Sequence, residues 1–175
     1  MDKPEAWLRG PIAGIDPLLM PAAHALVQVR EEAERIVEGL SPDELNARPG
    51  GGAAVAFHLR HIAGSIDRLA TYARGATLSE DQRSAAAEEA AGGAADPASL
   101  LSGVSRAVAA ALQQMRETPR GSLTEARAVG RAGLPSTVIG LLFHLAEHAQ
   151  RHAGQAVTTA KFARRATPSG PCAPR

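Results

Sequence analysis

Residues 141–155 read LLFHLAEHAQRHAGQ, and this stretch indicates both the fold and the kind of site to expect. His144, His148 and His152 recur every fourth residue among leucines and alanines, which places the three imidazoles along one side of a predicted helix. On a helical wheel, His152 borders the central apolar stripe, and His148 and then His144 lie progressively further towards solvent. The stripe itself consists of Val138, Leu142, Leu145, Ala149, Ala156 and Ala160.

Four segments carry the three- and four-residue apolar spacing of amphipathic helices. They are residues 17–40, 53–74, 97–118 and 135–164, the last beginning at Pro135 or Ser136, in the first turn where proline is tolerated. Aromatic residues make up only 3% of the chain and apolar residues 45%, so the core must be built from leucine, valine, isoleucine and alanine. This composition favours packed helices over a β-sandwich.

The connections complete the predicted fold. Residues 41–52 are turn formers, and residues 77–96 indicate a short helix followed by a glycine-rich break. Residues 120–136, RGSLTEARAVGRAGLPS, form a long connection of the kind that is often functional. Because no strand-like alternation is visible, we predict an all-α, up-down four-helix bundle with a long connection before the last helix. One domain is expected over residues 1–166, followed by a disordered tail at 167–175.

Bulk properties exclude several classes of partner. The formal net charge of +1 gives no field that would favour nucleic acid or an anionic membrane surface. The single cysteine, Cys172, cannot form an internal disulfide, and no apolar run reaches membrane-spanning length. The first residues, MDKPEAWLRGP, do not resemble a signal peptide. We therefore expect a cytoplasmic protein that binds neither nucleic acid nor membrane.

The histidines predict a divalent metal site. A pair at i and i+4 can aim two ring nitrogens at one point, and a third donor must come from another element. The segment FHLRHIAGSIDR, residues 57–68, offers His58 and His61, and the wheel places His58 nearer the apolar stripe. A lone histidine near an apolar face is more often a hydrogen-bonded or surface residue. Five of the six histidines in two helices favour a metal, with a position open to water or substrate.

The segments 57–68 and 143–155 together resemble the DinB-like (DinB/YfiT) superfamily of metal-dependent enzymes. The resemblance implies a DinB/YfiT-like helical bundle that commonly forms a homodimer, with zinc or nickel bound by His61, His148 and His152. Better-understood relatives are thiol-dependent S-transferases that use bacillithiol or mycothiol, or isomerases that use mycothiol, in which the metal lowers the pKa of the thiol. Many relatives have a further histidine where this chain has Arg151, a departure that weakens the transfer of any specific activity.

Four further residues are candidates to line the pocket beside the metal, while no catalytic residue is assigned. His58 is the rival of His61, and His144 lies one turn before His148. Gln155 could orient a ligand imidazole through its free N–H group. Arg131, in the connection before the last helix, could hold a carboxylate of a substrate or thiol cofactor, although a solvated loop charge is the favoured explanation.

The leading functional hypothesis is a metal-dependent transferase or hydrolase-like enzyme. It would carry out thiol-dependent transfer, or a related Lewis-acid step, on a small electrophile as substrate. The competing hypothesis is a non-catalytic metal-binding protein of the stress response, and a third is a vestigial site in a protein that acts through its dimer surface. A fourth protein ligand without an adjoining pocket would favour the non-catalytic class, and an open site beside a cleft would favour the enzyme.

Overall fold

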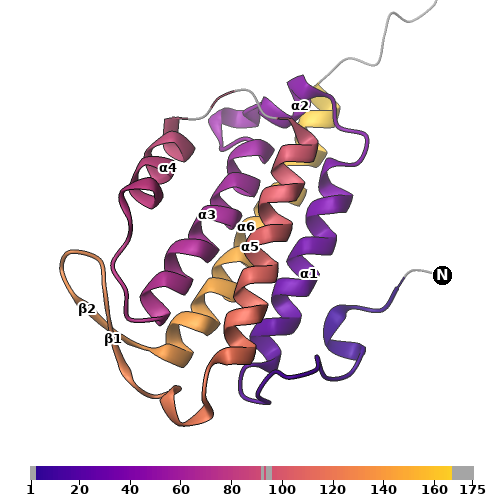
Figure 1. Cartoon of the computed structure of the whole chain (residues 1–175). Helices are drawn as coiled ribbons and strands as arrows, with labels where there is room; N and C mark the ends of the chain where they lie inside the picture. The colour runs from indigo at the N-terminus through magenta and orange to yellow at the C-terminus, as the bar shows by residue number, and fades with distance from the viewer. Residues whose placement is uncertain (1–2, 92, 94–95, 167–175) are drawn as a thin grey trace, which may run out of the picture.

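The computed structural model describes residues 3–91, 93 and 96–166, so the expected disorder at 167–175 lies outside the described residues. The chain is mostly helical, as the apolar spacing predicted, and four long helices lie side by side (Figure 1). These are α1 (Met20–Val37), α3 (Val55–Ala73), α5 (Pro97–Glu117) and α6 (Val138–Ala166).

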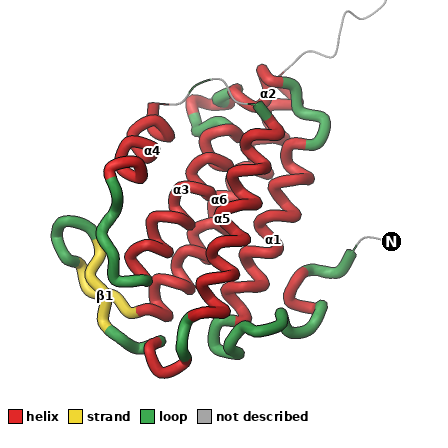
Figure 2. Tube along the Cα trace, viewed as in Figure 1, coloured by secondary structure: helices red, strands yellow, loops and turns green. Residues whose placement is uncertain are grey.

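The four long helices form a ring in which α3 and α1 each pack against both α6 and α5. Helices α3 and α5 are parallel: Gly103 lies beside Ala63, and eleven residues later Gln114 donates to the carbonyl of Ala70. Helix α6 runs antiparallel to α3 (Figure 1). The helix directions are therefore not strictly alternating, because the chain crosses the length of the bundle between α3 and α5 (Figure 2).

The core lies between these helices and is aliphatic. All six residues of the stripe expected on the last helix are buried, as are Leu26 and Val29 of α1 and Leu59 and Ile62 of α3. Leu18, which the periodicity placed in the first helix, is instead 52% exposed. It precedes α1 in a turn where its amide donates to the Asp16 carboxylate. No helix among the described residues is apolar over enough of its length to cross a bilayer.

Short elements cover the ends and one side of the bundle. Helix α2 (Pro42–Asn46) begins at a capping box in which Ser41 and Glu44 bond to each other's backbone amides. Helix α4 (Glu80–Ala91) is the short helix expected within 77–96, and it lies alongside α3 (Figure 1). Three short 3₁₀ helices complete the helical elements of the described residues; they span Ala6–Leu8, Pro49–Gly51 and Arg120–Ser122.

The connection before α6 differs from the prediction. Strands β1 (Ala126–Val129) and β2 (Leu134–Thr137) pair antiparallel across a turn with Gly130 and Gly133 at positive φ. The expectation of no strand was therefore wrong, and α6 begins at Val138, after the strand that contains Pro135. Four residues a strand are too few to produce a visible alternation. The hairpin is held by tertiary contact, since Arg127 donates to the carbonyl of Ala73 at the end of α3.

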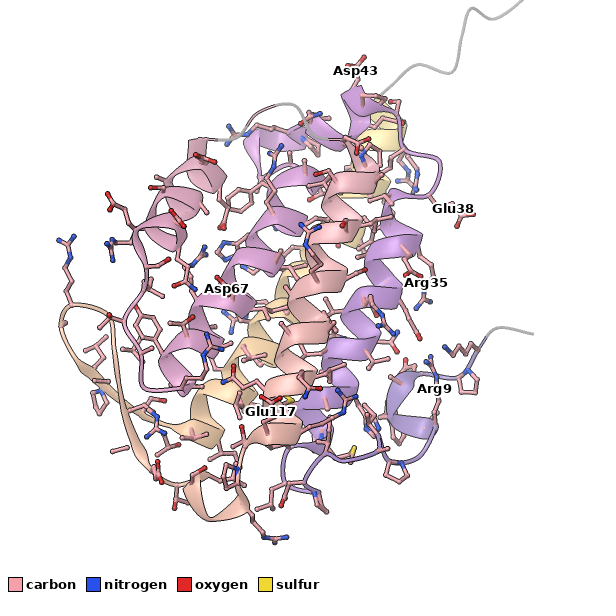
Figure 3. The ribbon with its side chains drawn as sticks, in the orientation of Figure 1. Arg9, Arg35, Glu38, Asp43, Asp67 and Glu117 are labelled. Carbon is pink, nitrogen blue, oxygen red and sulfur yellow. The ribbon has the colours of Figure 1, made fainter. Side chains whose placement is uncertain are left out.

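Ion pairs attach the N-terminal segment to α1. Arg9, labelled in Figure 3, donates two hydrogen bonds to the carboxylate of Glu31, and Lys3 donates a third. The Arg9 hydrogen bond is the main cause that lowers the pKa of Glu31 to about 2, against the opposing effect of burial. Glu31 is consequently ionised at any pH at which the protein is expected to work.

Candidate metal centre

Three histidines from two antiparallel helices converge on one point. His61 lies in the second turn of α3, and His148 and His152 lie on consecutive turns in the middle of α6. Their donor atoms lie within 4.8 Å of one another, the only such histidine, cysteine or carboxylate group found among the residues that the structure describes. The Nε2 atoms of His61 and His148 are 2.8 Å apart.

The buried stripes of α3 and α6 determine where these imidazoles lie. Leu59 and Ile62 flank His61, and Leu145 and Ala149 flank His148; all four are buried. With those residues facing the core, the histidines are left at the edge of the α3–α6 interface, half-buried. The rings pack closely: the centroid of His152 lies 4.3 Å from that of His61 and 4.6 Å from that of His148.

His58 is not one of the three histidines whose donor atoms converge. The residue is 5% exposed, and its Nδ1 lies 3.1 Å from Nδ1 of His152. It therefore reaches the group through a hydrogen bond to one of the three members. The wheel, which placed His58 nearer the apolar stripe, described its burial correctly but did not identify which histidine meets His148.

A residue that the sequence did not single out completes the surroundings of His61. Glu89 on α4 is 8% exposed, and its carboxylate accepts a hydrogen bond from Nδ1 of His61 and others from Arg68. The ring of Phe57 stacks on the imidazole of His61 at a centroid distance of 5.5 Å. Glu89 lies in the alanine-rich stretch AAAEEAA, where nothing in the sequence distinguishes it from Glu88.

Burial lowers the pKa of three histidines in and beside the cluster, His58, His148 and His152. Burial lowers the pKa of His152 to about 4, with a further contribution from the neighbouring histidines. Burial likewise lowers the pKa of His148 and of His58, each assisted by the charge on His61. At Glu89 burial acts to raise the pKa, but the hydrogen bonds from His61 and Arg68 outweigh it and hold the pKa below its usual value. At neutral pH His58, His148 and His152 are therefore uncharged, and the carboxylate of Glu89 is ionised.

This donor set fits a divalent transition metal. Neutral imidazoles present bare nitrogens, and three histidines are an established ligand set for zinc. In a tetrahedral zinc site with bonds of about 2.0–2.1 Å, two bound nitrogens lie about 3.3–3.4 Å apart. The present donors lie within 4.8 Å of one another, so the imidazoles reach that spacing through side-chain shifts of about 1–1.5 Å.

The pocket candidates separate into two that border a hollow beside His152 and two that do not. A hollow of about 720 Å³ between α3 and α6 is bordered by His58, His152 and Gln155. His144 is exposed and pairs with Glu147 on the outer side of α6, although its ring lies 5.5 Å from that of His148. Of the four candidates, His58 and Gln155 border this hollow.

Arg131 is remote from the histidines. It is exposed in the turn of the β-hairpin, and the hairpin packs at the C-terminal end of α3 against Ala73. Ala73 lies twelve residues beyond His61, or about 18 Å along the helix at 1.5 Å per residue. The proximity of Arg131 to helix α6 in sequence therefore does not bring it to the centre, because the connection folds into a hairpin at the far end of α3.

Two comparisons with known proteins bear on the identity of the chain. No curated protein matches the chain. A family model described as the DinB superfamily matches residues 25–156, which is three quarters of the chain and includes all three converging histidines. The extent of that match leads to one conclusion: this chain belongs to the DinB superfamily.

Proposed function

We propose that the protein is a metal-dependent enzyme in which His61, His148 and His152 hold a divalent ion, zinc or nickel. The observation that carries the proposal is the convergence of three imidazole donors from α3 and α6 within 4.8 Å. A bound ion would act as a Lewis acid that lowers the pKa of a thiol or water at its open position. We propose a thiol-dependent transfer to a small electrophile, with a thiol of the bacillithiol or mycothiol type.

The surroundings of the histidines support an enzyme over a closed metal store. Three protein donors leave a four-coordinate ion with one free position, and the hollow beside His152 gives a small molecule access to that side of the cluster. The phenyl ring of Phe57 and the side chains of Thr158 and Thr159 also border this hollow. These apolar and hydroxyl groups can bind the body of a small ligand and exclude part of its water.

A thiol cofactor implies a reducing compartment, in agreement with the cytoplasmic location expected from the single cysteine. We also propose a homodimer, as is common among relatives. The aromatic rings of Phe143 and Phe162 on α6 are 58% and 54% exposed, which provides apolar surface for a partner copy. Light scattering coupled to size-exclusion chromatography would measure the mass, and a monomer at micromolar concentration would contradict the dimer.

The metal is tested by elemental analysis of protein purified without a metal-affinity tag. We expect the wild type to carry near-stoichiometric zinc or nickel and His148→Ala to lose it, since two imidazoles bind weakly. The matched control is His144→Ala, one turn earlier on the same helix and outside the group. Equal metal in the wild type and His148→Ala would remove His148 from the ligand set.

The reaction is tested separately with bacillithiol, mycothiol and a chromogenic electrophile such as a chlorodinitrobenzene. We expect conjugation that needs the protein, the thiol and the metal, and that chelation abolishes. A metal-loaded protein without activity towards either thiol would favour the non-catalytic metal-binding function instead.

A further inference from the structure

Helix α4 is attached to the bundle in an unusual way. The other helices of ten or more residues contribute buried apolar residues to the common core, whereas none of the described side chains of α4 belongs to it. Two polar side chains reach α3 instead. Gln82 donates to Asp67 and Thr71, and Glu89 contacts His61 and Arg68. Asp67, labelled in Figure 3, lies on the side of α3 that faces α4.

Gln82 and Glu89 are seven residues apart, which places them on one face of α4, two turns from each other. Gln82 is partly exposed and bonds to the exposed Asp67 as well as to the buried Thr71. The contact through Glu89 is buried, and it brings a carboxylate into a position that costs free energy unless it is fully hydrogen-bonded. A buried acid of this kind needs a reason beyond attachment, because an apolar side chain would attach the helix more simply.

The surface of α3 is shaped to receive this carboxylate. A Cβ atom at Gly64 would lie 2.5 Å from Oε2 of Glu89 and 2.6 Å from Nη1 of Arg68, so only glycine leaves room for the pair. His61, Gly64 and Arg68 lie at i, i+3 and i+7 and thus share one face of α3. Gly64 supplies the space, Arg68 the opposite charge and His61 the hydrogen-bond donor.

The contact determines which nitrogen of His61 carries its proton. An ionised carboxylate only accepts hydrogen bonds, so Nδ1 of His61 must donate. In a neutral imidazole the proton on Nδ1 leaves Nε2 bare, and Nε2 is the atom that faces Nε2 of His148 at 2.8 Å. The hydrogen bond also restrains rotation of the ring, which Phe57 contacts on its face.

We propose that Glu89 is a positioning residue of the metal centre, which holds His61 as the Nδ1–H tautomer and directs Nε2 to the point shared with His148 and His152. This inference rests on the proposed metal site and adds a residue from a third helix to it. Gly64 and Arg68 act through Glu89: the glycine admits the carboxylate and the arginine balances its charge. Outer hydrogen bonds of this kind typically change metal affinity by 10- to 100-fold.

The first test compares Glu89→Ala with Glu88→Ala in zinc affinity, measured by competition with a chromogenic chelator. Glu88 is the adjacent acid on the same helix and is exposed, so the two variants change charge and helix composition alike. We expect Glu89→Ala to bind zinc about 10- to 100-fold more weakly and Glu88→Ala to match the wild type. Glu89→Gln, which keeps an oxygen acceptor but loses the charge, should lie between them.

The second variant leaves every acid and histidine in place. Gly64→Ala should displace the carboxylate and lower zinc affinity in the same direction, while Gly103→Ala on α5, whose Cβ would make only an ordinary contact at 3.8 Å, should not. Circular dichroism and thermal unfolding establish that each variant is folded. Should Glu89→Ala fail to fold, Gly64→Ala carries the test alone.

A spectroscopic readout separates positioning from a general structural effect. In the metal-free wild type, ¹⁵N–¹H correlation spectra of the imidazoles should show His61 protonated on Nδ1, and Glu89→Ala should lose that preference. Zinc affinity unchanged in both Glu89→Ala and Gly64→Ala, or His61 protonated on Nε2 in the wild type, would overturn the inference and leave the metal site standing. A wild type that binds no zinc would overturn both proposals.

Discussion

Helix α6 meets two neighbours in two different ways. Towards α1 it presents small and aliphatic side chains: Ala22 and Ala146 border one hollow between the two helices, and Ile36 and Ala160 border another. Towards α3 it presents His148 and His152 to another imidazole. The α1–α6 interface stabilises the bundle by removing apolar surface from water, whatever is bound. The α3–α6 interface places polar rings where leucine would pack, so its contribution to stability depends on its partners.

The two faces of α6 therefore have different roles. The face towards α1 stabilises the fold, whereas the face towards α3 carries the histidines at some cost in stability, as is common at functional positions. These separate roles can be tested. A substitution in the α1–α6 interface should lower stability without changing zinc affinity, and a substitution of a histidine in the α3–α6 interface should change zinc binding.

The largest effect on stability is expected from the apolar interface. Leu26 of α1 is fully buried, so Leu26→Ala should lower the free energy of unfolding by about 2–5 kcal/mol through lost burial and the cavity that remains. Urea denaturation measures this loss. The zinc affinity of the folded variant should equal that of the wild type, and a parallel loss of affinity would show that the two interfaces are not separable.

The next effect belongs to the histidine interface. Zinc that binds only the native state at about 100 times its dissociation constant should stabilise the protein by about 2.7 kcal/mol. Thermal unfolding with and without zinc measures the shift in Tm. The shift should be retained in His144→Ala and absent in His148→Ala. An equal shift in both variants would mean that zinc binds elsewhere on the chain.

The smallest effect is the pH dependence of the metal-free protein. The pKa of His152 is lowered to about 4, and those of His58 and His148 are also lowered, whereas an unfolded histidine has a pKa of about 6.5. The unfolded chain therefore binds more protons between these values. Stability should be fully present above pH 6.5 and fall as the pH drops towards 4.

Urea midpoints at pH 7, 5.5 and 4.5 measure this dependence, and the loss should be modest because His148 and His152 are half-exposed and screened by water. Glu31, with a folded pKa of about 2 and an ordinary value of 4.5, adds its own loss as the pH approaches 4.5, because the unfolded carboxyl takes up protons there. The change between pH 7 and 5.5 therefore reports the histidines. His152→Ala should flatten the profile. A midpoint that stays constant from pH 7 to 4.5 in the wild type would contradict the burial of neutral imidazoles.

Local pattern accounts for much of what could be predicted. The four long helices follow from apolar spacing, and the stripe from Val138 to Ala160 is buried as expected. Deviations occur where tertiary contacts decide: α6 begins at Val138 because the preceding residues pair as β2, and Leu18 is exposed in a turn before α1. Neither deviation changes which face of its helix a histidine occupies, because His61, His148 and His152 lie inside α3 and α6 and not at the helix ends.

The sequence by itself determined that His148 and His152 share one side of a helix, because helical periodicity is a property of neighbouring residues. Only the tertiary structure decided that His61 meets them while His58 bonds to His152, and that Glu89 lies behind His61. Those relations depend on the antiparallel packing of α3 with α6 and on the path of α4 along α3. Residues 28 and 87 positions from His61 are joined to it by long-range packing, which no local spacing encodes.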